Sequence, residues 1–136
     1  MKINHLKVNH LVNPLGNDLN HPTVSYVVED TTGMKQTMGQ IVVALDDQFS
    51  SIVYDSGERE AMLSTGFELP ITLNPSTRYF WKVRAAADNG DWAQSETAWF
   101  ETAKDNLWSA DWISPAADKK LQVCMNKNIE IYKPIE

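Results

Sequence analysis

The chain has only one cysteine, Cys124, among its 136 residues. A single cysteine cannot form an internal disulfide, and it cannot supply the several thiolates of a cysteine-rich metal site. The disulfide-stapled class of small secreted domains is therefore excluded. Cys124 itself is more typical of a small buried apolar side chain than of a nucleophile.

A long apolar run is also missing. The longest covers residues 41–45, whereas a membrane-spanning helix needs roughly 20 residues, so we predict no membrane partner. Residues 1–5 lack the apolar core of a signal peptide. This predicts a cytoplasmic protein if Met1 is the natural start, and a secreted or periplasmic one if a signal peptide has been removed.

Positive charge is scarce. The chain carries 12 basic and 18 acidic residues, a formal net charge of −6. Nucleic-acid binding needs a basic surface, so we predict no nucleic-acid partner. The 43% of hydrophobic and 22% of charged residues are ordinary for a folded globular chain and exclude wholesale disorder. The length suits one domain with little left over.

Helical periodicity is almost absent, and only residues 103–109 suggest a short helix. Apolar residues alternate with polar ones instead, which is typical of strands. Strands are predicted at residues 4–12, 24–29, 36–45, 52–55, 67–69, 78–87 and 97–102. Turn residues separate them, including Asn13 to Gly16 and Asp88 to Asp91. About seven short strands predict an all-β, immunoglobulin-like β-sandwich over residues 1–103.

The pattern changes after this sandwich. Residues 104–136 read as a linker followed by the first strands of a second β-sandwich, at 121–125 and 128–132. Two strands do not form a stable unit alone, and unpaired strand backbone seeks another edge. The tail could pair with its own sandwich or with another copy of the chain. We favour the second alternative, a tail-mediated homodimer.

No catalytic constellation is recognisable. The acidic groups Asp46–Asp47 and Asp55, Glu58, Glu60 fall in polar flanks of strands, where burial that would raise a carboxyl pKa is not expected. His5 and His10 are separated by an odd number of residues in one predicted strand, so they would face opposite ways. With His21 and a single cysteine they do not predict a metal site. We therefore predict no catalytic residue, no metal and no cofactor.

One motif identifies the kind of sandwich. Leu73, Pro75, Thr77, Tyr79, Val83 and Ala85 fit the pattern L-x-P-x-T-x-Y-x-x-x-V-x-A, which resembles that of fibronectin type III domains. The resemblance implies a tyrosine corner, in which the Tyr79 hydroxyl bonds to backbone a few residues upstream. We expect its partner within residues 73–76.

Several short segments, in order along the chain, resemble a narrower family, the bacterial α-L-rhamnosidases. They are Leu6 to Gly16 with its Asn-Pro-Leu-Gly end, Pro22 to Tyr26, Gln36 to Ala44, Tyr54 to Gly57, Thr77 to Arg84, Trp99 to Thr102 and Ala110 to Ile113. The resemblance implies a fibronectin-like module that lies N-terminal to a carbohydrate-binding-like sandwich and an (α/α) barrel. The barrel of that family cleaves α-L-rhamnosyl bonds with inversion, using paired carboxylates. Nothing in this sequence matches the barrel motifs, so no catalytic residue is carried over.

The predicted function is therefore that of a non-catalytic accessory module, whose partners are the remaining domains of a glycoside hydrolase. A free-standing module that binds carbohydrate or protein is the alternative. Trp92, just after a turn, and Trp108 and Trp112, beyond the sandwich, are the candidate contacts for a sugar or a domain interface.

Overall fold

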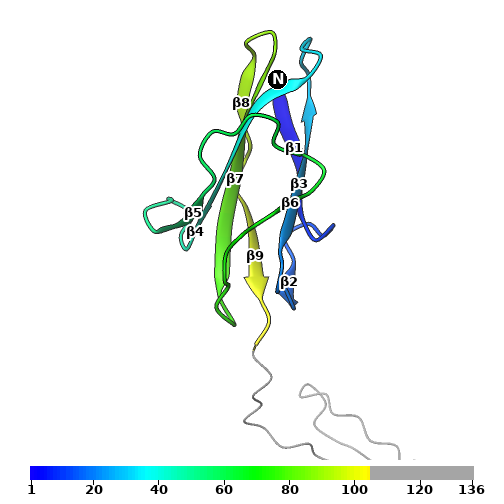
Figure 1. Cartoon of the computed structure of the whole chain (residues 1–136). Helices are drawn as coiled ribbons and strands as arrows, with labels where there is room; N and C mark the ends of the chain where they lie inside the picture. Colours follow the sequence, from blue (N-terminus) through cyan, green and yellow to red (C-terminus); the bar gives the residue numbers. More distant parts are fainter. Residues whose placement is uncertain (105–136) are drawn as a thin grey trace, which may run out of the picture. The chain divides into compact units, whose positions relative to one another are not determined.

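Residues 1–104 are described by the computed structural model, and their nine strands form two sheets (Figure 1). The small sheet has the order β1-β3-β6, with strands β1 (Lys2–Val8), β3 (Thr23–Glu29) and β6 (Phe67–Glu68). The large sheet has the order β2-β9-β7-β4-β5, and β8 pairs with β7 beside this path. Its strands are β2 (Leu15–Asn17), β4 (Gln36–Ala44), β5 (Ile52–Asp55), β7 (Arg78–Ala87), β8 (Trp92–Gln94) and β9 (Ala98–Thr102). The all-β sandwich prediction is confirmed.

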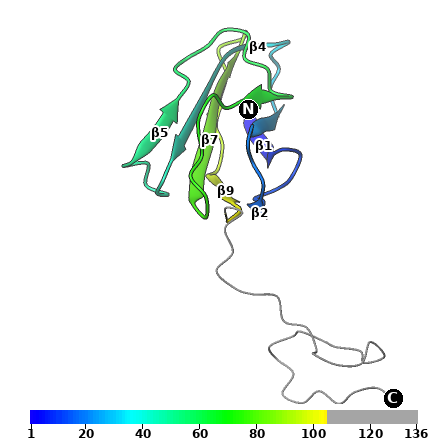
Figure 2. The same cartoon turned by 60° about the horizontal axis from the view of Figure 1, so that its bottom comes forward.

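Strand β7 is the centre of the large sheet. Its alternating pattern buries Tyr79, Trp81, Val83 and Ala85 on one face, as the sequence predicts. It pairs antiparallel with β4 on one side, and with β9 and β8 on the other. Figure 2 shows β5 at the edge of this sheet. The other face of β7 points away from the small sheet, and it is called the outer face below.

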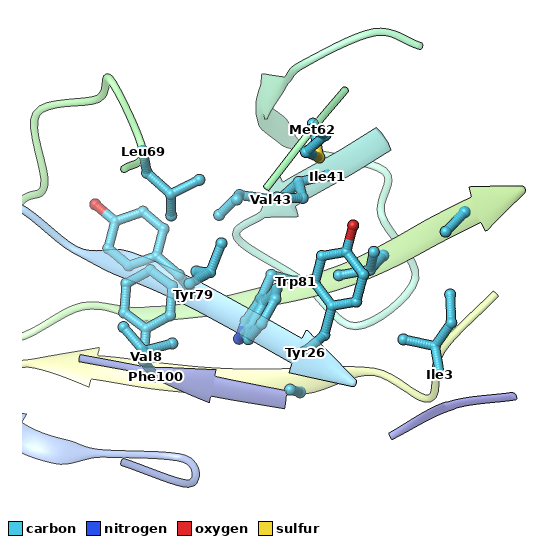
Figure 3. Packing of buried hydrophobic residues seen from close by; sticks show 14 of the residues in the cluster. Ile3, Val8, Tyr26, Ile41, Val43, Met62, Leu69, Tyr79, Trp81 and Phe100 are labelled. Atoms are coloured by element: carbon cyan, nitrogen blue, oxygen red, sulfur yellow. The ribbon is translucent and has the colours of Figure 1, made fainter. Parts of the chain in front are cut away.

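The core fills the space between the sheets (Figure 3). Trp81, Phe100 and Ile41 from the large sheet and Val24 from the small sheet are completely buried. The rings of Tyr79 and Phe100 stack with centroids 5.3 Å apart. Burial of each such side chain is worth about 1.5–3 kcal/mol, so the two sheets stabilise one another.

Two details of the predicted strand pattern are wrong. The first strand ends at Val8, not at residue 12, because Asn9 and His10 adopt left-handed φ angles of 47° and 67°. Val8 and Leu11 then exchange backbone hydrogen bonds of 2.9 Å across this turn. The prediction also lacked β2 and β8, which have three residues each and are too short to show alternation.

Several predictions fall on residues 105–136, which lie outside the described part of the chain. They concern Trp108, Trp112, Cys124 and the two tail strands. Within residues 1–104, no helix is long and apolar enough to cross a bilayer.

Candidate functional site

The point where the chain leaves the sandwich is held on both sides. The Ala103 N–H donates to the Asn17 carbonyl at 3.0 Å, and the Ala103 carbonyl accepts from the Ser76 N–H at 3.0 Å. One residue earlier, the Thr102 N–H donates to the Thr77 carbonyl at 3.0 Å. The chain therefore continues beyond Ala103 from a fixed position at the end of β9, and not from a loose loop.

A tyrosine corner lies beside this exit. The hydroxyl of Tyr79 accepts a hydrogen bond of 2.9 Å from the Asn74 N–H, which confirms the sequence prediction. The Thr102 hydroxyl donates to the Asn74 carbonyl at 2.6 Å and accepts from the Thr77 N–H at 3.0 Å. The start of β7 and the end of β9 are thereby joined through the same short segment.

The Asn-Pro-Leu-Gly segment covers the edge of β9. The Asn13 side-chain oxygen accepts from the Trp99 N–H at 3.1 Å, and the Pro14 carbonyl accepts from the Glu101 N–H at 2.9 Å. Leu15 then lies opposite Glu101 in a parallel pair. The sequence predicts only a turn here, because Pro14 has no N–H and Gly16 permits a positive φ, here 70°. The structure shows that the segment is also an edge strand.

Three aliphatic side chains on this same segment face solvent. Leu11, Val12 and Leu15 are 47%, 65% and 62% exposed. Leu15 lies near the chain exit, because it is opposite Glu101 on β9 and because Asn17, two residues later, holds Ala103. Val12 lies nearer the start of β9, beside residues 96–98.

Trp92 lies at the other end of the large sheet, at the start of β8 (Figure 1). It is 61% exposed, as its place after the turn predicts. The Arg84 guanidinium lies 4.8 Å from the centroid of its ring, a cation–π contact that fixes the indole on the outer face. The alternation of residues 78–87 puts Arg84 on the solvent-facing side of its strand, but the pair with Trp92 also requires strand β8, which the sequence does not predict.

The turn before Trp92 is cross-linked to the loop between β3 and β4. The Thr31 hydroxyl and the Asn89 amide both donate to Asp91 at 2.9 Å, and the Met34 N–H donates to Asp88 at 2.9 Å. The bonds from Asn89 and then Thr31 hold the pKa of Asp91 below its usual value. These bonds hold the turn that precedes Trp92 against the loop between β3 and β4.

Two further cation–π contacts lie on the outer face. The Arg78 guanidinium is 4.3 Å from the Trp99 ring centroid, and the Lys82 ammonium is 4.1 Å from that of Phe49. Arg78 also forms an ion pair with Glu101 at 3.4 Å. Three cations on β7 thus each contact an aromatic ring.

The acidic residues do not form a catalytic pair in the described residues. Asp46 lies in the turn after β4, where its carboxylate accepts from the Ser50 hydroxyl and the Ser50 and Ser51 N–H groups. The bond from the Ser50 hydroxyl contributes most to lowering its pKa, the opposite of what a general acid needs. Asp55 accepts from Gln40 and from the Gly57 N–H, at 2.9 and 2.8 Å.

The histidines lie apart. His5 pairs with Glu29 at 3.7 Å and His21 with Glu68 at 3.4 Å, both exposed, while His10 belongs to the turn after β1. In residues 1–104, no three His, Cys, Asp or Glu side chains come close enough to hold a metal.

A shallow groove of about 440 Å³ lies between the sheets at the Met34 end. Two of its polar side chains are paired with each other: the Tyr26 hydroxyl donates to Gln36 at 2.9 Å, and the Gln36 amide donates to the Met62 carbonyl at 3.1 Å. Burial raises the pKa of Tyr26, so its hydroxyl stays protonated. Tyr26 and Gln36 are therefore engaged with partners inside the chain.

Residues 3–106 match the model of one protein family, described as the Rha78A-like, N-terminal immunoglobulin domain. The chain is 33% identical over 126 residues to an alpha-L-rhamnosidase of Streptomyces avermitilis, a match that covers 86% of this chain and 12% of that relative. This chain therefore spans about an eighth of the relative's length.

Solved structures agree. The crystal structure of Streptomyces avermitilis alpha-L-rhamnosidase complexed with L-rhamnose matches with 31% identity and a TM-score of 0.79, over 90% of this chain and 12% of that one. The alpha-L-rhamnosidase from Dictyoglumus thermophilum matches with 28% identity and a TM-score of 0.74, over 84% and 14%. The sixth fibronectin type III domain of a human protein matches at 17% identity with a TM-score of 0.56, over 82% and 92%, which shows the shared fold alone.

Proposed function

Because this chain belongs to the Rha78A-like, N-terminal immunoglobulin domain family, we propose that it is a non-catalytic accessory module of an α-L-rhamnosidase-like glycoside hydrolase. Its role is structural: it spaces, docks and stabilises the other domains. One observation carries this proposal: the chain is similar to only 12% of an alpha-L-rhamnosidase. Most of such an enzyme, including any catalytic apparatus, would lie in other domains.

The chain exit supports a docking role. The backbone is paired on both sides through Ala103, so a domain that follows would start from a fixed point. The exposed Leu15, opposite Glu101 on β9, lies near that point and offers apolar surface for the partner. In this proposal residues 1–103 are the module, and residues 104–136 are a linker and the start of the next β-sandwich. Trp108 and Trp112 would be aromatic anchors between the two.

The parent enzyme would hydrolyse terminal α-L-rhamnosyl bonds with inversion. Inversion requires a general acid and a general base whose carboxyl groups are about 6.5–9.5 Å apart, with a water molecule between sugar and base. Both carboxylates would come from a barrel domain beyond this chain.

The test is a deletion in the full-length parent. Removal of the segment that corresponds to residues 1–103 should lower the melting temperature and the soluble yield of the remaining domains. Their kcat on an aryl α-L-rhamnoside at low temperature should change little, because no reacting group is lost. A parent that is equally stable without the module would contradict the docking role, and loss of kcat in a folded deletion variant would contradict the non-catalytic role.

A single charge-neutral replacement is a milder test. Leu15→Ser should weaken docking, because it removes exposed apolar surface near the exit while the core is untouched. The same exchange at Leu63, which is 66% exposed elsewhere, should leave the parent's melting temperature unchanged.

A further inference from the structure

The outer face carries two cations that have no carboxylate partner. Among residues 1–104, the four ion pairs leave out both Lys82 and Arg84. Each lies instead on an aromatic ring, Lys82 on Phe49 and Arg84 on Trp92. The charge left on this face suits an anionic ligand.

The third pair on the face differs in one respect. Arg78 contacts the Trp99 ring with similar geometry, but its guanidinium also meets Glu101 at 3.4 Å. Its charge is therefore balanced within the chain. The Arg84 end of the face is the part where a ligand could supply the missing negative charge.

Side chains around Arg84 form two rows across strands β8, β7 and β4. In the first row Trp92, Ala86 and Met38 are paired side by side, and in the second row Gln94, Arg84 and Gln40. Neighbouring strands are about 4.8 Å apart, so Trp92 and Met38 stand roughly 10 Å apart with only a methyl group between them. The first row is thus a shallow apolar dip beside a large exposed ring.

The second row is polar throughout. Arg84 has a planar guanidinium suited to bind a carboxylate through two parallel hydrogen bonds. Gln94 is exposed and Gln40 half-buried, and both carry amides that can bond to hydroxyl groups. The nearby Asp55 accepts from the Gln40 amide at 2.9 Å and from the Gly57 N–H. It is in none of the four ion pairs of residues 1–104, so it balances neither Arg84 nor Lys82 directly.

From this arrangement we propose that the outer face around Trp92, Arg84 and Lys82 binds an acidic saccharide. The apolar face of a pyranose ring lies against Trp92 above Ala86, and its carboxylate meets the guanidinium of Arg84. Lys82, two residues along β7 and so roughly 7 Å away, faces a second acidic group of an oligosaccharide. The Trp99 end forms no such site, because Phe80 fills the place between Trp99 and Ala44 and because Glu101 balances Arg78.

The experiment is a titration of the 136-residue chain with sodium D-galacturonate and its oligomers, followed by ¹⁵N–¹H NMR and calorimetry. The neutral counterpart D-galactose and the acidic polypeptide polyglutamate are titrated in parallel. We expect saturable binding of galacturonate with a Kd of about 1 mM, shifts at the Trp92 indole and the Arg84 side chain, and weakening by salt. Galactose should bind about tenfold more weakly.

Matched variants locate the site. Arg84→Gln and Trp92→Ala should each weaken galacturonate binding about tenfold or more, and Ala86→Phe should abolish it by filling the dip. Arg78→Gln and Trp99→Ala, the same changes at the other end of the face, should bind as the unchanged chain does. An NMR spectrum of each variant is the control that checks whether the variant is folded.

Three results would overturn the proposal: no saturable binding of galacturonate, equal binding by folded Arg84→Gln, or polyglutamate binding as tightly as the galacturonate oligomers. The last would show a surface for acidic proteins in place of saccharides. None of these results bears on the accessory role, which the parent deletion tests separately.

Discussion

The backbone N–H of Asn74 donates a 2.9 Å hydrogen bond to the hydroxyl oxygen of Tyr79, five residues later in the chain. Tyr79 is buried at the end of the sandwich, and its ring stacks on Phe100. The same segment bonds to Thr102, the last residue of β9. One tyrosine therefore ties the connection before β7 to the point where the chain leaves the domain.

Replacement of this tyrosine should be costly. Tyr79→Phe removes the acceptor of the Asn74 N–H, and the loss of such a part-buried hydrogen bond costs about 0.5–1.5 kcal/mol. The free energy of unfolding, measured with urea on the chain, should fall by that amount with an unchanged m-value. A loss smaller than a few tenths of a kcal/mol would show that the corner contributes little.

Replacement of a second tyrosine, Tyr54, by phenylalanine should not lower the free energy of unfolding. The hydroxyl of Tyr54 on β5 is buried and has no hydrogen-bond partner in the described residues. Tyr54→Phe removes an unpaired polar atom and keeps the ring, so the free energy of unfolding should stay the same or rise. The same urea titration compares the two variants directly. Equal destabilisation by both would contradict the hydrogen-bond explanation for Tyr79.

The sequence predicts the centre of the fold well. Strand β7 alternates over ten residues, and burial enforces that period because a shift by one residue would turn Trp81 and Val83 to solvent. The tyrosine corner is predictable for a similar reason. It is a local contact over five residues, with a spacing that fixes its geometry.

The edges and the outer face are harder to predict. Strand β2 depends on bonds from Asn13 to Trp99, 86 residues away, and its own three residues show no period. The exposure of Trp92 follows from its neighbouring turn. Its contact with Arg84 requires the β7–β8 register, which places the two diagonally across a hairpin.

The stability contributed by the hydrogen bonds between the loops next to Trp92 should depend on pH. Hydrogen bonds from Asn89 and Thr31 lower the pKa of Asp91 below the ordinary 3.8. A carboxyl group whose pKa is lower in the folded state stabilises that state at every pH above its pKa in the unfolded chain. This stability is lost as the pH falls through its pKa in the folded chain. Asp91→Asn should therefore be less stable than the unchanged chain at neutral pH, and the difference should shrink in acid. A difference that is independent of pH would exclude Asp91 as its source.

The chain should have no glycosidase activity by itself. Asp46 is ionised and capped by serines, and Asp55 is held by Gln40, so neither is available as a general acid. Purified chain incubated with an aryl α-L-rhamnoside should release phenol at the uncatalysed rate. Release above that rate, removed by a point substitution in residues 1–104, would contradict this prediction.

The association state should depend on residues 105–136. Their sequence alternates apolar and polar side chains at 121–125 and 128–132, which predicts strands in need of partners. We expect light scattering to give a dimer for the whole chain and a monomer for a chain that ends at Lys104. Pairing between copies is favoured because a fibronectin-like sandwich has little room for two more strands, and symmetric edge pairing closes a dimer without further contacts. If both the whole chain and the shortened chain are monomers at high concentration, pairing between copies is contradicted, and the tail would then pair within its own chain.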